Sequence, residues 1–289
     1  MTPAVAIAVL LLSAAPPGHV TVVYAADLAG WLEPCGCSAD QRGGLARAAT
    51  ALARIRAENP DTVFVAGGDL LFAGPLDPER KAQELAAART MAEVLRSMRL
   101  AASWPGERDL AAGKRFLESS GLPFTRSKRI GPVGFGGLGS VPAAPVRVAV
   151  IHEGGSRAAA PRADEARRQG IDLLLAAHRE GILDDDASRA ILDTAVPVVQ
   201  VQGRGQVLAR IDFFLRGDRK KGFLVLPGPS QRAEELDLLV ERRAEYGRRR
   251  AAAEAAGNGA LAGALSTKIA ELSAREKELR AAPPPVPPD

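Results

Sequence analysis

The sequence has 289 residues, which is enough for one large domain and an appendage, because single hydrophobic cores stop growing near roughly 250–300 residues. Its hydrophobic content of 46% and charged content of 25% are typical of a soluble globular protein, and aromatic residues make up only 4%, so the core must consist mainly of Val, Leu, Ile and Ala. The net charge of +4 is small and scattered in short runs, which argues against a nucleic-acid partner.

Residues 4–15 (AVAIAVLLLSAA) form an apolar run that ends before a Pro-Pro-Gly break. The run is too short to span a bilayer comfortably and has the length of a signal peptide, so we predict a signal peptide over 1–18 and export, most simply to a periplasm. The preceding MTP lacks Lys and Arg, and a buried element of the mature fold is the alternative. In an oxidising compartment a disulfide would persist.

From residue 19 to about 228, short β-branched runs alternate with amphipathic segments, which predicts an α/β domain. The predicted strands are 20–25, 62–66, 147–151, 172–176, 197–201 and 207–215. The predicted helices are 45–58, 78–98, 111–118, 163–169 and 185–194. The glycine-rich segment 131–139 lacks the Lys-Ser/Thr of a phosphate-binding loop and is interpreted as an irregular strand or turn.

After Pro227-Gly228-Pro229 the composition changes, and 229–281 reads as two helices broken at Gly257-Asn258-Gly259. So short a break predicts an antiparallel helical hairpin. A stripe of Leu and Ile with spacings of 4, 3 and 7 along the second helix is typical of coiled-coil packing. The Pro-rich residues 282–289 should form an extended, exposed tail.

Two carboxylates follow predicted strands: Asp27 after VTVVYAA and Asp69 after TVFVAGG. A third strand ends near His178, and His152 follows a fourth. Because α/β folds build their sites at the carboxyl ends of strands, Asp27, Asp69 and His178 are candidates for holding a divalent cation. Either aspartate could instead cap a helix, and His152 could be a hydrogen-bonded structural residue.

Five segments resemble, in order, the sequence blocks of the calcineurin-like metallophosphoesterases, and in particular those of exported 5'-nucleotidases. They are YAADLAGWLEP, GGLARAATALARIR, VFVAGGDLLFAGP, LLLAAHREG and VQGRGQVLARIDF. The resemblance covers about two-thirds of the chain. It implies a two-sheet sandwich flanked by helices, a centre of two divalent metal ions such as Mn, Zn or Fe, and hydrolysis of a phosphoester such as a nucleotide.

Carried over position by position, the resemblance makes Asp27 a ligand of the first metal and Asp69 the carboxylate that bridges both metals. His178 would be a ligand of the second metal, and Gln206 the neutral residue of the last block.

Four positions depart from the family pattern. Ala29 stands in place of the first histidine, and Glu107 in place of the metal-binding asparagine. Arg108 replaces the histidine that steadies the transferring phosphoryl group, and Arg204 replaces the histidine of the last block.

These replacements predict a degenerate centre. Arg204, together with Arg108, is expected to occupy the space of the metals and to neutralise Asp27 and Asp69 by hydrogen-bonded pairing. Phosphoester hydrolysis would then be weak or lost. The alternative is residual hydrolysis with one metal ion held by Asp27, Asp69, Glu107 and His178.

The two cysteines, Cys35 and Cys37, lie one residue apart, eight residues after the first carboxylate. Three interpretations remain open: a strained disulfide, a thiolate pair that binds a soft metal such as Zn or Cu, and simple loop packing. PCGC followed by Gln-x-Gly-Gly-Leu-x-Arg also resembles a bacterial subgroup of exported phosphoesterase-like proteins, some fused to or encoded with multihaem cytochromes. That resemblance implies the competing hypothesis, a non-catalytic redox or binding accessory protein whose partner is an exported electron-transfer or envelope protein.

Overall fold

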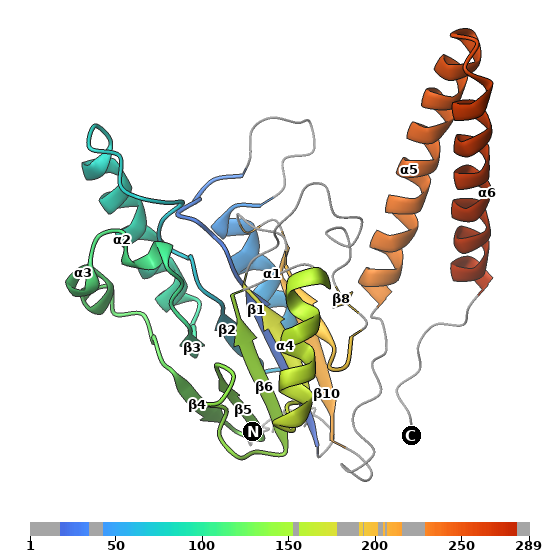
Figure 1. The fold of residues 1–289 in the computed structure, drawn as a ribbon. Helices are drawn as coiled ribbons and strands as arrows, with labels where there is room; N and C mark the ends of the chain where they lie inside the picture. The colour runs from blue at the N-terminus through green and yellow to red at the C-terminus, as the bar shows by residue number, and fades with distance from the viewer. Residues whose placement is uncertain are drawn as a thin grey trace, which may run out of the picture. The chain divides into compact units, whose positions relative to one another are not determined.

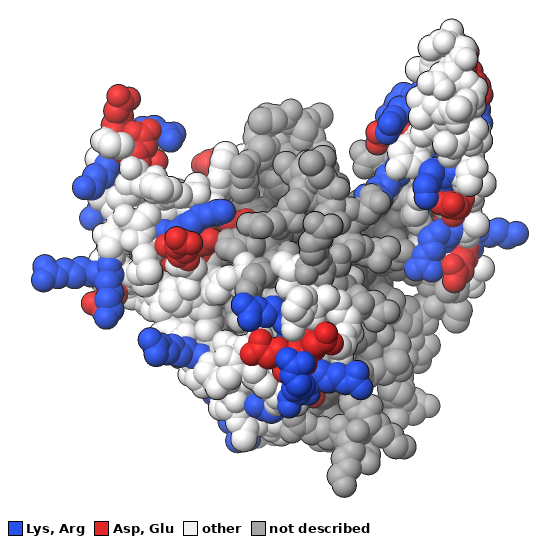
Figure 2. Space-filling view, in the orientation of Figure 1, with Lys and Arg blue, Asp and Glu red and all other residues white. Residues whose placement is uncertain are grey.

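The computed structural model describes residues 18–34, 43–152, 156–177, 191–192, 194–201, 205, 207–215 and 229–281 (Figure 1). The chain divides into two compact units, Met1–Phe223 and Leu224–Asp289. On the face shown in Figure 2, the basic and acidic side chains of the described residues are interspersed over the surface.

Four strands of the first unit form one sheet in the order β10-β1-β2-β3. Their bounds are β1 His19–Ala25, β2 Val63–Ala66, β3 Ala102–Ser103 and β10 Ala209–Phe214. β1, β2 and β3 are parallel, and β10 runs antiparallel to β1. The parallel strands β1 and β2 are short apolar runs rich in β-branched residues and are buried on both faces, as expected for strands covered on two sides.

Six strands form the second sheet in the order β4-β5-β6-β7-β9-β8. Their bounds are β4 Ser127–Ile130, β5 Val133–Gly136, β6 Val146–Ile151, β7 Leu173–Ala176, β8 Ile191–Leu192 and β9 Val198–Gln200. The four inner strands are parallel, and β4 and β8 pair antiparallel at the edges.

The helices that cover the outer faces of the sheets are α1 Leu45–Glu58, α2 Lys81–Ser97 and α4 Ser156–Arg168. The 3-10 turn η1 Arg108–Leu110 and the short helix α3 Lys114–Ser119 follow β3. In α1, Leu45, Ala48 and Leu52 recur at helical spacing and are buried on the sheet side. Gly44, which precedes α1, has φ 87°, a conformation that favours glycine.

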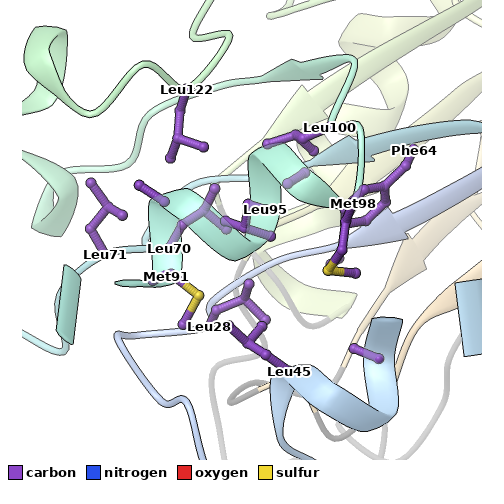
Figure 3. Close-up of a cluster of buried hydrophobic side chains, with 14 of the residues drawn as sticks. Leu28, Leu45, Phe64, Leu70, Leu71, Met91, Leu95, Met98, Leu100 and Leu122 are labelled. Carbon is purple, nitrogen blue, oxygen red and sulfur yellow. The ribbon is translucent and has the colours of Figure 1, made fainter. Parts of the chain in front are cut away.

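Three apolar clusters define the layers. The first lies between the four-stranded sheet and the helices α1 and α2, where Leu28, Leu70 and Leu71 pack with Met91 and Leu95 (Figure 3). The second lies between the two sheets, and the third lies between the six-stranded sheet and α4. This two-sheet sandwich flanked by helices confirms the predicted fold class.

The structure corrects several predicted elements. Ile191–Leu192, placed in a helix by the sequence, forms β8, because its β-branched and apolar side chains pair with β9 at the sheet edge. α4 begins seven residues earlier than predicted and contains Pro161. The segment 131–139 contains the regular strand β5.

The second unit is a helical hairpin, as predicted, of α5 Pro229–Ala255 and α6 Gly259–Ala281. Gly257 turns the chain with φ 71°, and Asn258 accepts a hydrogen bond from the N–H of Leu261 at the start of α6. The largely buried carboxylate of Glu276 in α6 pairs with Arg243 of α5 at 2.6 Å, which fixes the register of the two helices. No helix within the described ranges has the length and apolar character needed to cross a bilayer.

Candidate functional site

The carboxyl ends of parallel strands from both sheets meet at one edge of the sandwich. Gly67 follows β2, and a Cβ added to it would lie 3.0 Å from the Cβ of Ala26 and 2.9 Å from that of Ala177. Ala26 follows β1 and Ala177 follows β7, so three strand ends converge on Gly67. His178 comes directly after this point but lies outside the described residues.

Asp27 and Asp69 lie in two turns that run side by side. The N–H of Asp27 donates to the carbonyl of Gly68 at 3.1 Å, and the N–H of Ala29 donates to that of Asp69 at 2.8 Å. Asp27, Ala29 and Asp69 have left-handed φ values of 50°, 52° and 58°, which aspartate tolerates better than most residues. Such strained backbone clusters at functional sites.

Neither aspartate caps a helix of the described chain. Gly44 precedes α1 and Arg80 precedes α2, so the helix-cap alternative is wrong. The side chain of Asp69 is only 1% exposed, and a carboxylate buried that deeply needs hydrogen-bonded partners.

Arg108 supplies these partners. Its backbone N–H donates to Oδ1 of Asp69 at 2.8 Å, and its Nε lies 3.6 Å from Oδ2 of the same carboxylate. Its guanidinium also donates to Oδ1 of Asp27 at 3.2 Å. One cation therefore lies against both carboxylates to which the family resemblance assigns the metals.

The other arginine of the prediction, Arg204, lies outside the described residues, as does Gln206. Gly205, between them, is described: a Cβ built there would lie 3.4 Å from the side chain of Leu28. The last sequence block thus passes beside the first one, as the resemblance implies.

Asp109 joins the turn of Asp69 to the segment that carries Gly106 and Arg108, a role that the sequence does not reveal. Its buried carboxylate accepts hydrogen bonds from the backbone N–H groups of Asp69, Leu70, Leu71 and Gly106, at 2.8 to 3.0 Å. Burial raises the pKa of the Asp109 carboxyl, the negative charge of Asp69 adds to this effect, and the backbone N–H groups oppose it. The 3-10 turn η1 delivers both Asp109 and Arg108.

Gly106 makes this close approach possible. A Cβ at this position would lie 2.7 Å from the backbone nitrogen of Asp69 and closer still to Oδ1 of its carboxylate. Gly106→Ala is expected to lower the free energy of unfolding by about 1–3 kcal/mol, because the buried turn cannot move aside without strain. Urea unfolding measures this.

Gly74→Ala is the matched control for that substitution. An added Cβ at Gly74 meets nothing within 4 Å, so its effect should stay within about 0.5 kcal/mol. Equal unfolding midpoints for the two alanine variants would contradict the close packing of Gly106 on Asp69.

Two further side chains lie at this edge. The ring carbon Cε1 of His152, which follows β6, would lie 2.7 Å from a Cβ built on Gly68, so the histidine faces the turn of Asp69. Tyr24, in β1, is fully buried. Its burial raises the pKa of the phenol well above the ordinary value, and the negative charge of Asp27 adds to this effect. Its phenol therefore stays neutral at physiological pH.

The described residues do not fit a two-metal centre. Among them, no group of three or more His, Cys, Asp or Glu side chains could hold a metal ion. Coulomb's law gives about 8 kcal/mol of repulsion between a divalent cation and a guanidinium at ~4 Å with an effective dielectric near 20, and about 2 kcal/mol in bulk water. The side chain of Arg108 is 42% exposed, so the penalty lies between these values.

No protein-family model matches the chain, and no curated protein matches it. Among solved structures, it is similar to a putative 5'-nucleotidase from Staphylococcus aureus, with a TM-score of 0.51 and 15% identity over 67% of this chain and 50% of that one. It also matches the calcineurin-like phosphoesterase YfkN from Bacillus subtilis, with a TM-score of 0.48 and 18% identity over 67% of this chain and 84% of that one. The match to the NAD nucleotidase of Haemophilus influenzae has a TM-score of 0.43 and 12% identity over 67% of this chain and 47% of that one.

The chain thus spans half the length of the Staphylococcus aureus protein. At 15% identity this similarity shows the fold alone, a two-sheet α/β sandwich flanked by helices as predicted from the sequence.

Proposed function

We propose that this chain is an exported protein with a 5'-nucleotidase-like metallophosphoesterase fold, in which an arginine has replaced the two-metal centre and phosphoester hydrolysis is weak or lost. The observation that carries the proposal is the position of Arg108, whose guanidinium pairs with Asp27 and whose backbone and side chain contact Asp69. The family resemblance supports it, because Ala29 and Glu107 stand where metal ligands are expected.

The chemical consequence follows from what phosphoryl transfer requires. Two metal ions would stabilise charge on the phosphoryl oxygens and supply hydroxide as nucleophile. Arg108 carries a single positive charge that already contacts the carboxylates of Asp27 and Asp69, and unlike a metal ion it cannot bind water and convert it to hydroxide. Neither function of the metals is therefore available from these three residues. At most a partial metal site would remain.

Hydrolysis assays test the proposal. With Mn, Zn or Fe supplied, the native protein should turn over nucleoside monophosphates and a generic aryl phosphate no faster than the background. Metal-dependent turnover by the native protein, if Asp69→Asn abolished it, would contradict the proposal. The quadruple variant Ala29→His, Glu107→Asn, Arg108→His and Arg204→His restores the family pattern at all four positions, and any gain in its turnover would show that the scaffold remains competent.

A second candidate function rests on the loop that carries the cysteines. Pro34 and Gly43 form an antiparallel bridge, and a Cβ on Gly44 would lie 3.0 Å from the ring of Pro34. The intervening residues, with Cys35 and Cys37, lie outside the described ranges. The closely spaced cysteines and their resemblance to exported phosphoesterase-like proteins support the alternative proposal, a redox or binding accessory protein that meets an exported electron-transfer or envelope partner through these cysteines.

Thiol labelling tests the second candidate. Protein taken from the periplasm should react with maleimide only after mild reduction, because a disulfide between Cys35 and Cys37 would block both thiols. Cys35→Ser is the control, since its remaining thiol should react without reduction. Two reactive thiols in the untreated native protein would exclude the disulfide.

A further inference from the structure

A depression of about 780 Å³ borders the site on the side of α2. It starts at Glu107 and Arg108 and extends along the loop after β2 to Pro78 and Lys81 at the beginning of α2. Its volume is within the range of small-molecule sites, roughly 300–1,000 Å³. None of its lining residues belongs to the undescribed parts of the chain.

The walls of the depression are apolar and stiff. Pro75, Leu76, Pro78 and Leu110 are among the residues that line it. Leu110 is 48% exposed, more than any other large hydrophobic residue in the described ranges. Because proline fixes its own φ angle, a wall built from two prolines loses little conformational entropy when a ligand binds.

Two charged side chains of the depression are uncommitted. Both Lys81 and Glu107 are exposed, and among the residues that the structure describes neither has an ion pair or a side-chain hydrogen bond. Arg108, in contrast, contacts the carboxylates of Asp27 and Asp69. The depression therefore offers one available cation and one available anion.

These charges discriminate between classes of ligand. A ligand that is only anionic would gain Lys81 but be repelled by Glu107. A ligand that is only cationic would gain Glu107 but face Lys81. A zwitterion can satisfy both groups, and an apolar side chain attached to it would cover Leu110 and the prolines.

We propose that this depression binds a small zwitterion with an apolar body, of which an apolar α-amino acid is the simplest example. Its ammonium pairs with Glu107, its carboxylate pairs with Lys81, and its side chain lies on Leu110 and Pro75. The site needs neither a metal ion nor hydrolysis, so its existence is independent of the function proposed above.

Ligand-detected NMR titrations of the full chain test this proposal with three probes: L-phenylalanine, N-acetyl-L-phenylalanine, which lacks the cation, and L-phenylalanine amide, which lacks the anion. The zwitterion should bind about threefold to fivefold more tightly than either analogue, the gain expected from one exposed ion pair. Glu107→Gln should remove the preference over the acetyl compound, and Lys81→Met the preference over the amide. Leu110→Ser should weaken the binding of all three probes.

Lys114→Met serves as the control, because Lys114 is exposed and does not line the depression. It should leave all three affinities unchanged. Any of three results would overturn the proposal. The three probes could bind the native protein with equal affinity, none of them could bind detectably, or the preference for the zwitterion could survive both Glu107→Gln and Lys81→Met.

Discussion

Asp109→Ala is expected to lower the free energy of unfolding by about 3–5 kcal/mol, the largest stability effect of any substitution at the site. The carboxylate is completely buried and accepts four backbone N–H bonds, from Asp69, Leu70, Leu71 and Gly106. Without it, these donors stay buried and lose their acceptor, and each unsatisfied donor costs about 1–3 kcal/mol. Partial relaxation of the turn keeps the total below the sum. Urea unfolding followed by circular dichroism measures the change.

Asp61→Ala provides the matched control. Asp61 is exposed, and among the described residues its side chain makes no hydrogen bond or ion pair, so its removal should change the free energy of unfolding by no more than about 0.5 kcal/mol. If Asp109→Ala proved as mild as Asp61→Ala, the carboxylate of Asp109 would not be the element that joins the two turns.

Arg108→Ala is expected to increase the affinity of the protein for Mn²⁺ by about tenfold or more. Even at the dielectric constant of bulk water, removing a unit positive charge at ~4 Å from a divalent cation relieves about 2 kcal/mol of repulsion. The same substitution frees oxygens of Asp27 and Asp69 that the guanidinium now contacts. The backbone N–H of residue 108 can still donate to Asp69, so the turn should keep its shape. Isothermal titration with Mn²⁺ measures the affinity.

Arg108→Lys separates charge from shape in this experiment. Lysine keeps the positive charge beside the carboxylates but cannot reproduce the forked geometry of the guanidinium. Its Mn²⁺ affinity should stay close to that of the native protein. Similar affinities for the native, alanine and lysine forms would show that the charge at this position does not control metal binding.

The pattern of the core elements could be predicted from the sequence. α1 has the bounds that its amphipathic period and the preceding Gly43-Gly44 predict. The inner strands other than β5 were found because their apolar runs are bounded by glycine and proline, whereas the segment of β5 was interpreted only as an irregular strand or turn. β3, β4 and β8 were not predicted, because strands of two to four residues, at or near the edge of a sheet, carry too few apolar positions to show a period.

The location of the site could be predicted from the sequence, but the contacts between its side chains could not. Asp27 and Asp69 lie together because carboxyl ends of parallel strands meet at one edge of a sheet. Which arginine pairs with them depends on the 3-10 turn that delivers Arg108, and no local pattern specifies that contact. The bonds of Asp109 to backbone N–H groups 38 to 40 residues away leave no trace in a single sequence.

His152 had a usable signal, since it directly follows the buried strand β6. The position of a residue after a parallel strand places it at the site edge, but hydrogen bonding of a structural histidine gives the same sequence pattern. Its ring approaches Gly68 and therefore lies beside the turn of Asp69, and that approach depends on the packing of one sheet on the other.

Elemental analysis of the native protein, purified without chelator from medium that contains Mn, Zn and Fe, tests the central claim most directly. If Arg108 has replaced the two-metal centre, the protein should carry well under one equivalent of these metals per chain, and Arg108→Ala should carry more than the native form. Two equivalents per native chain, together with turnover of a nucleotide or another phosphoester, would contradict the claim.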